Sequence, residues 1–198
     1  MEKPYDQRML KGTIMKVLIA SDIHGSAYWA GRLMEAIDVE QPDRVVLLGD
    51  LLYHGPRNDL PRDYAPKRVI PLLNDLASSG RLVAVRGNCE AEVDQMVLAF
   101  PCMADHNILV DPTADGGPCT LFLTHGHVYG PGYHNSVDAW PALPERSALV
   151  YGHTHIKVSE KNEEHGAWVF NPGSVGIPKD GSASFGIYEN GRFEHRLL

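Results

Sequence analysis

The stretch KVLIASDIHG, residues 16–25, decides the fold of this chain. Its first five residues are β-branched or aliphatic, a composition typical of a short buried strand. The polar turn that follows contains Asp22 and His24, and Ser26 then suits the N-cap of a helix. Apolar residues recur after it at helical spacing, namely Ala30, Leu33, Met34 and Ile37. The stretch therefore predicts a strand, a polar turn and a helix in succession.

The same arrangement recurs further along the first half of the chain. We expect a second strand at residues 44–48, followed by Asp50, and a third at residues 82–85, followed by Asn88. A helix is expected between these two strands, with Pro71 either in its first turn or at a kink. The first half is therefore predicted to alternate strands and helices.

The second half is predicted to be richer in strands. Expected strands lie at residues 121–124, 148–151, 167–170, 185–188 and 193–197. Asn190-Gly191, between the last two, is typical of a tight hairpin turn. Helical units followed by strands favour a mixed α/β sandwich with helices outside. We expect one domain over residues 15–198, preceded by an N-terminal tail of residues 1–14 without the apolar segment of a secretory signal.

Composition limits the classes of protein to which the chain can belong. Its 198 residues are 43% hydrophobic and 22% charged, which is ordinary for a globular domain. A formal net charge of -7 argues against non-specific binding to nucleic acid or to a membrane surface. No apolar run approaches the roughly 20 residues that span a bilayer. Three cysteines without a C-x-x-C pair favour a reducing compartment, so we expect the protein to be cytoplasmic.

Five of the expected strands end in metal-capable residues beside a glycine. These residues are Asp22, His24, Asp50, Asn88, His125, His153 and His155. Loops at strand ends project side chains into a shared crevice in α/β folds. Each short motif is weak evidence by itself, because an isolated Asp or His after a strand is more often a cap or turn residue. The whole set in this order is much more specific.

The types of ligand in this set indicate the kind of metal centre. Two carboxylates, four imidazoles and one amide suit Mn, Fe, Zn, Co or Ni better than calcium. Seven donors are too many for one tetrahedral ion but fit two ions if one carboxylate bridges them. Asp50 is the candidate bridge because it stands alone on its loop. Two ions about 3.5–4 Å apart can hold a hydroxide and bind phosphoryl oxygens during in-line displacement.

The order Asp-x-His, Gly-Asp, Gly-Asn, His and Gly-His-x-His resembles the calcineurin-like metallophosphoesterase superfamily. The short chain and the variant Asn88-Cys89-Glu90 resemble its small bacterial phosphodiesterase branch. This resemblance implies a four-layer α/β/β/α sandwich of two mixed sheets flanked by helices. It also implies two divalent ions, most often manganese, with Ni, Co, Fe or Zn as alternatives. The implied reaction is hydrolysis of a small-molecule phosphodiester by a metal-bridging hydroxide.

The resemblance further implies which residues hold each ion. One ion is expected on Asp22, His24, Asp50 and His155. The other is expected on Asp50, Asn88, His125 and His153. Asp50 and Asn88 thereby count among the catalytic residues, together with His127, which lies two residues after His125. His127 could donate a proton to the substrate, and the alternative is a supporting or surface position.

Three further residues are candidates for contact with the substrate. Many members of the superfamily have a histidine directly after the asparagine, where this chain has Cys89. A thiol with an ordinary pKa of about 8.5 cannot offer a positive charge, which favours diesters with good leaving groups. Arg57 and His54 lie on the loop after Asp50, where a cation could face a phosphate oxygen. The alternatives are a buried packing role for Cys89 and a loop salt bridge for Arg57.

Two other functions remain open from the sequence. The same site could act as a phosphomonoesterase or nucleotidase, although Cys89 disfavours this. A related fold also serves as a non-catalytic scaffold in protein assembly, so the fold alone does not establish an enzyme. A scaffold, however, has no need of seven metal-capable residues in register. Exposed sheet edges also make a homo-oligomer possible.

Overall fold

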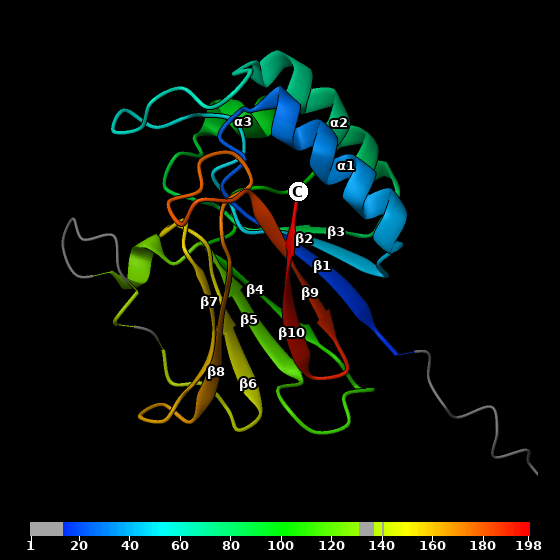
Figure 1. The fold of residues 1–198 in the computed structure, drawn as a ribbon, viewed down its shortest axis with the longest axis vertical. Helices are drawn as coiled ribbons and strands as arrows, with labels where there is room; N and C mark the ends of the chain where they lie inside the picture. The colour runs from blue at the N-terminus through cyan, green and yellow to red at the C-terminus, as the bar shows by residue number, and fades with distance from the viewer. Residues whose placement is uncertain (1–13, 131–136, 140) are drawn as a thin grey trace, which may run out of the picture.

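The computed structural model describes residues 14–130, 137–139 and 141–198, which contain two mixed five-stranded sheets (Figure 1). The first sheet has the order β10-β9-β1-β2-β3. Its strands are β1 (Lys16–Ala20), β2 (Arg44–Leu47), β3 (Leu82–Ala84), β9 (Ser184–Glu189) and β10 (Arg192–Leu197). The second sheet has the order β4-β5-β6-β8-β7. Its strands are β4 (His106–Val110), β5 (Thr120–Thr124), β6 (Ser147–Val150), β7 (Lys157–Asn162) and β8 (Ala167–Pro172).

Parallel strands form the centre of each sheet, and antiparallel strands lie at the edges. In the first sheet β1 pairs with β2, and β2 with β3, in parallel, whereas β9 and β10 are antiparallel. In the second sheet β5, β6 and β8 run parallel, whereas β4 and β7 pair antiparallel to their neighbours. The carboxyl ends of parallel strands meet at one edge of a sheet, so the turns after them lie together.

Helices cover the outer face of the first sheet. Helices α1 (Ala27–Glu40) and α2 (Pro66–Ser78) lie side by side there, and α3 (Glu92–Val97) follows β3 (Figure 1). Ser26 caps α1, since its side chain accepts a hydrogen bond from the backbone N–H of Trp29. Helix α2 continues through Pro71. The predicted N-cap of α1 is therefore confirmed.

Alternation along β1 divides the core into two layers. Leu18 and Ala20 face α1 and α2, whereas Val17 and Ile19 face the second sheet. All four side chains are completely buried, as are Leu121 and Leu123 on the other side of the inter-sheet layer. A strand that is buried on both faces has an almost continuous run of apolar residues, and this run made the strand at residues 16–20 predictable from the sequence.

The outer face of the second sheet carries a smaller apolar cluster. Phe122, Leu149, Tyr151 and Val169 form it, and Tyr129 packs against it from a single 3-10 turn, η2 (His127–Tyr129). Within the described ranges, this turn is the one helical element on the outer face of the second sheet. The fold class is confirmed as an α/β sandwich of two mixed sheets.

Two strands were not predicted from the sequence. Exposed and half-buried residues alternate along β4, and β7 has the largely polar sequence KVSEKN. Both strands lie at the edges of the second sheet. Charged and polar residues at edges discourage pairing with other chains, so such strands lack the strong apolar signal of central ones.

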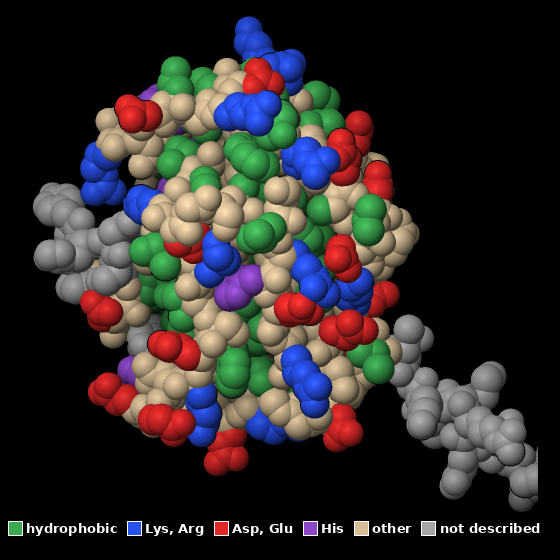
Figure 2. Space-filling view, in the orientation of Figure 1, with side chains coloured by type: hydrophobic (Ala, Val, Ile, Leu, Met, Phe, Trp, Pro, Cys, Tyr) green, Lys and Arg blue, Asp and Glu red, His purple; other side chains and the backbone are tan. Residues whose placement is uncertain are grey.

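The surface of the described residues carries charges of both signs. Figure 2 shows acidic and basic side chains interspersed on the described part of this face, without a contiguous basic patch. Among the helices of the described residues, none is both long and apolar enough to cross a membrane.

Candidate metal centre

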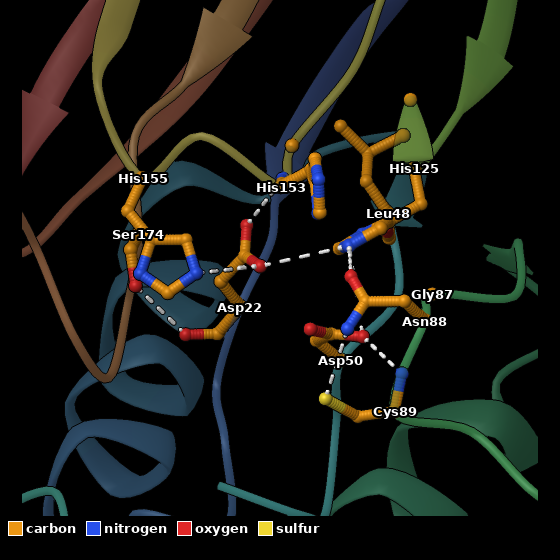
Figure 3. Close-up of polar contacts among 12 residues, drawn as sticks. Asp22, Leu48, Asp50, Gly87, Asn88, Cys89, His125, His153, His155 and Ser174 are labelled. Atoms are coloured by element: carbon orange, nitrogen blue, oxygen red, sulfur yellow. Dashed lines mark hydrogen bonds and ion pairs between the residues drawn. The ribbon is translucent and has the colours of Figure 1, made fainter. Parts of the chain in front are cut away.

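The turns after the parallel strands of both sheets bring the seven predicted ligand residues to one place, where Figure 3 labels all of them except His24. The first sheet contributes Asp22, His24, Asp50 and Asn88, and the second sheet contributes His125, His153 and His155. In Figure 3, Asp22 lies between His155 and His125, with Asn88 and Asp50 beside His125. The site therefore joins the two sheets across the end of the sandwich.

Five of these seven residues have a left-handed backbone conformation. The φ angles are +57° for Asp22, +50° for His24, +54° for Asp50, +63° for His153 and +60° for His155. This region is sparsely populated by residues other than glycine, and such strain gathers at functional sites. Backbone bonds hold the turns, since Asp22 N donates to Gly49 O at 3.1 Å and His24 N to Asp50 O at 2.9 Å. The strained backbone turns the side chains inward.

Backbone carbonyls fix the orientation of three imidazoles. His24 Nδ1 lies 2.7 Å from Tyr53 O, His125 Nδ1 lies 2.7 Å from Leu48 O, and His155 Nδ1 lies 2.6 Å from Ile177 O. A carbonyl can only accept, so each Nδ1 carries the proton and each neutral ring presents the lone pair of Nε2. This arrangement of the outer nitrogen is typical of metal-binding histidine.

The inward nitrogens and carboxylate oxygens are close together. His155 Nε2 lies 3.2 Å from both His24 Nε2 and Asp22 Oδ1. Asp50 faces both sides, with Oδ2 3.7 Å from His24 Nε2 and Oδ1 3.6 Å from His125 Nε2. Asn88 Oδ1 lies 3.1 Å from His125 Nε2. Asp50 therefore has the central position that a bridging ligand needs.

The donor set fits divalent cations. The lone pairs of His24 Nε2 and His155 Nε2 face each other at 3.2 Å, which is unfavourable unless a cation or a proton lies between them. Asp22 Oδ1 is buried and has no hydrogen-bond donor among the described residues. Burial by itself would raise the pKa of Asp22, but the neighbouring His155 and His24 lower the pKa well below its usual value. A buried carboxylate together with imidazole nitrogens forms the mixed N/O donor set that suits divalent transition-metal ions.

Glu90 supports this cage and was not identified from the sequence. Its buried carboxylate accepts hydrogen bonds from the backbone N–H groups of Asp50, Leu51 and Gly87, at 2.8, 2.7 and 2.5 Å. Burial and the charge of Asp50 raise the pKa of Glu90 to about 7. Glu90 thereby fastens the turn after β2 to the turn after β3. The only signal for it was its place directly after Asn88-Cys89.

The segment Asn171-Pro172-Gly173-Ser174 fastens the turn after β6 to the turn after β1. The Asn171 amide donates to Gly152 O at 2.7 Å and to Thr154 Oγ1 at 3.0 Å. Ser174 Oγ donates to Asp22 O at 2.9 Å, and Asp22 Oδ2 accepts from His153 N at 3.1 Å. These bonds keep ligands from the two sheets in a fixed relation.

A cleft of about 290 Å³ opens onto the cage. Its lining residues are Asp50, Arg57, Asn58, Asn88, His153, His155 and Lys179. Arg57 was expected near the substrate, whereas Lys179 and Asn58 were missed because nothing in their local sequence marks them. Burial and the nearby charge of Arg57 lower the pKa of Lys179. Two cations therefore stand at the mouth of the cage.

The remaining predicted residues lie around this cleft. Cys89 is half-buried, its N–H donates to Asp50 Oδ1 at 2.8 Å, and burial raises the pKa of its thiol. His127 lies in η2 with its ring 5.4 Å from that of His125, and burial and His125 lower its pKa to about 4. His54 packs edge-on between Tyr53 and Tyr64 and is not among the residues that line the cleft. At neutral pH, Cys89 and His127 are therefore both uncharged.

Comparison with known proteins agrees with this geometry. Residues 15–191 match the model of the calcineurin-like phosphoesterase superfamily domain, so the chain belongs to the calcineurin-like phosphoesterase superfamily. This family is one of metal-dependent phosphoesterases, which makes divalent metal ions the expected cofactor.

Within the family, the chain is similar to a named bacterial enzyme. It is 46% identical to phosphodiesterase YfcE of Escherichia coli K12 over 179 residues, which cover 89% of each chain. A solved structure of YfcE, described as a phosphoesterase from E. coli, matches with a TM-score of 0.78 over 89% of each chain. An archaeal phosphodiesterase at 21% identity matches 93% of this chain and all of its own, with a TM-score of 0.62, and shows the shared fold.

Proposed function

We propose that this chain is a phosphodiesterase that holds two divalent ions, most favourably manganese, in the cage described above. The observation that carries the proposal is the convergence of inward Nε2 atoms and carboxylate oxygens on two sides of Asp50. Similarity to YfcE, which is named a phosphodiesterase, supports the choice of reaction. Residues 15–198 act as one catalytic domain in this proposal.

Each ion has its own ligands in this proposal. Asp22, His24, Asp50 and His155 hold one ion, and Asp50, Asn88, His125 and His153 hold the other. When bound, such ions lower the pKa of a coordinated water and stabilise negative charge on phosphoryl oxygens. The chain's part is to fix the ligands: carbonyls orient three imidazoles, and Glu90 holds the Asp50 turn in place.

The uncharged residues beside the cage favour diesters over monoesters. A monoester carries two negative charges at neutral pH, so its binding and hydrolysis gain from a positively charged acid beside the phosphate. Burial raises the pKa of Cys89, and that of His127 is lowered to about 4, so neither residue supplies such a charge. A small diester with a good leaving group needs less proton donation. The cleft of about 290 Å³ suits a small substrate.

Hydrolysis of bis-p-nitrophenyl phosphate by metal-stripped protein tests the proposal. Mn, Ni, Co, Zn and Mg are added back separately, and the matching aryl monoester is measured beside the diester. We expect turnover that depends on added metal and a higher kcat/KM for the diester. In Asp50→Asn the bridging charge is lost, so we expect turnover to fall to background and at least one metal equivalent to be lost.

The outcomes separate the parts of the proposal. Full activity of Asp50→Asn would refute the bridging role of Asp50. A clear preference for the monoester would replace the diesterase by a monoesterase on the same site. Two bound ions per chain without turnover of either substrate would leave the metal cage in place and exclude this substrate class. Asp59→Asn, on the exposed loop after β2, is the matched control and should bind metal as the wild type does.

A further inference from the structure

Arg57 and Lys179 present two positive charges to the cleft from different parts of the fold. Arg57 lies on the loop between β2 and α2, and Lys179 lies between β8 and β9. We propose that these two cations select phosphodiesters whose non-leaving arm carries a negative charge, such as a carboxylate or a second phosphate. This inference rests on the proposed diesterase function and adds the class of substrate to it.

The two cations are close enough to act together. Both line the same cleft as the ligand residues His153 and His155. The backbone N–H of Lys179 donates to His155 O at 3.1 Å, which fixes the start of its side chain beside the cage.

Within the described ranges, neither cation is neutralised by the protein. No carboxylate of the described residues lies within ion-pair distance of Arg57 or Lys179. The acidic neighbour of Lys179 in the sequence, Asp180, instead pairs with Lys157 at 2.7 Å. Arg68 and Arg86, by contrast, are paired with Asp63 and Asp105. The donors of Arg57 and Lys179 are therefore free for a ligand in the cleft.

The charge of the site favours an anionic arm. Two divalent ions outweigh the two carboxylates of Asp22 and Asp50, and Arg57 and Lys179 add two further positive charges. A diester group carries one negative charge at neutral pH and offsets only part of this excess. An arm with its own carboxylate or phosphate would offset more and would accept hydrogen bonds from both cations. With a neutral arm, Arg57 and Lys179 would remain hydrated and would make no ion pair with the substrate.

Three substrates that share one leaving group test this inference. They are the p-nitrophenyl diesters of ethyl phosphate, choline phosphate and carboxymethyl phosphate, whose second arms are neutral, cationic and anionic. Each is assayed with manganese at neutral pH, and kcat and KM are measured separately. We expect kcat/KM to be highest for the carboxymethyl ester, by about tenfold over the ethyl ester, and lowest for the choline ester.

Variants then assign this preference to the two cations. In Arg57→Met and Lys179→Met the preference for the carboxymethyl ester should fall by about threefold each, mainly through KM, as fits partly exposed charges. Because both residues line the cleft, kcat/KM for the ethyl ester should also fall, but by less than kcat/KM for the carboxymethyl ester, and the metal content should stay at the wild-type value. Lys161→Met, whose side chain is 55% exposed on β7 and pairs with Glu163, is the matched control and should keep the full preference.

Failure of this inference differs from failure of the proposed function. If none of the three esters is hydrolysed with any of the metals Mn, Ni, Co, Zn or Mg, the diesterase proposal itself is wrong. If all three esters react alike, or the choline ester reacts best, the selection for an anionic arm is wrong. If Lys179→Met slows all three esters equally, the lysine contacts the reacting phosphate instead of the arm, which also overturns the inference.

Discussion

Substitution of Gly87 by alanine tests whether the position of Asp50 sets metal binding. A Cβ on Gly87 would lie 2.1 Å from Asp50 Oδ1, 2.5 Å from Asp50 N and 2.8 Å from Glu90 Oε2. The substitution changes no charge and removes no hydrogen-bonding group. Gly87 is also outside the left-handed region, so alanine meets no backbone strain there. The methyl group acts by displacing the Asp50 turn and the Glu90 carboxylate that holds this turn.

The size of the effect follows from these contacts. Because Asp50 N belongs to the backbone, the whole turn has to shift, and overpacking of this kind costs about 1–3 kcal/mol. For a chain of this length, 1 kcal/mol corresponds to about 2–4 °C, so we expect Tm of metal-free protein to fall by about 2–12 °C. Displacement of groups that orient metal ligands typically costs about 10–100-fold in metal affinity.

Two measurements check this prediction. Thermal unfolding is followed on metal-free protein, and manganese affinity is measured by calorimetric titration. Gly31→Ala is the matched control, since a Cβ at Gly31 within α1 would meet nothing within 4 Å. It should stabilise the protein by about 1 kcal/mol, because alanine favours a helix, and leave metal affinity unchanged. Wild-type Tm and wild-type affinity in Gly87→Ala would refute the reasoning, and a lower Tm with full affinity would refute the link to Asp50.

Two further predictions concern stability away from the metal centre. Tyr188 is completely buried, and its single O–H is shared between two acceptors, Asp111 Oδ2 at 3.0 Å and Pro118 O at 2.9 Å. Tyr188→Phe leaves both acceptors without this donor and should cost about 1.5–3 kcal/mol. Urea unfolding measures this loss, and metal affinity should stay at the wild-type value; an unchanged midpoint would contradict the role of the hydroxyl. Ser26→Ala removes the N-cap of α1 and should cost about 1 kcal/mol. Its Tm is compared with that of Ser78→Ala, an exposed serine near the end of α2, and equal values for the two variants would contradict the capping argument.

The central strands could be predicted from the sequence because they are buried on both faces. The limits of β1 agree with the prediction, and those of β2, β5 and β6 differ from it by one residue at one or both ends. The hairpin at Asn190-Gly191 was also predicted, and both residues have the positive φ angles that this turn requires, +49° and +73°. The edge strands β4 and β7 could not be predicted, because half-exposed and charged residues leave no regular apolar pattern.

The predicted ligand residues were recognisable because each lies directly after a strand in a short polar motif. Lys179 and Asn58 carry no such mark, since only the folding of distant loops brings them to the cleft. Glu90 is a different case, because its side chain acts on backbone N–H groups of Asp50 and Leu51, about forty positions away, which a local motif does not reveal. The assignment of the seven residues to two ions stays a prediction until metal content is measured.

The left-handed backbone at Asp22, His24, Asp50, His153 and His155 bears on how this chain can diverge. Glycine would relax each position, and each non-glycine residue held there costs on the order of 1–3 kcal/mol. Each of these side chains is also buried, so glycine would relieve the strain and at the same time leave a cavity of comparable cost. The two effects offset each other, and a descendant released from metal chemistry would gain little stability from glycine at these positions. Retention of these residues in such a lineage would therefore not by itself be a sign of retained catalysis.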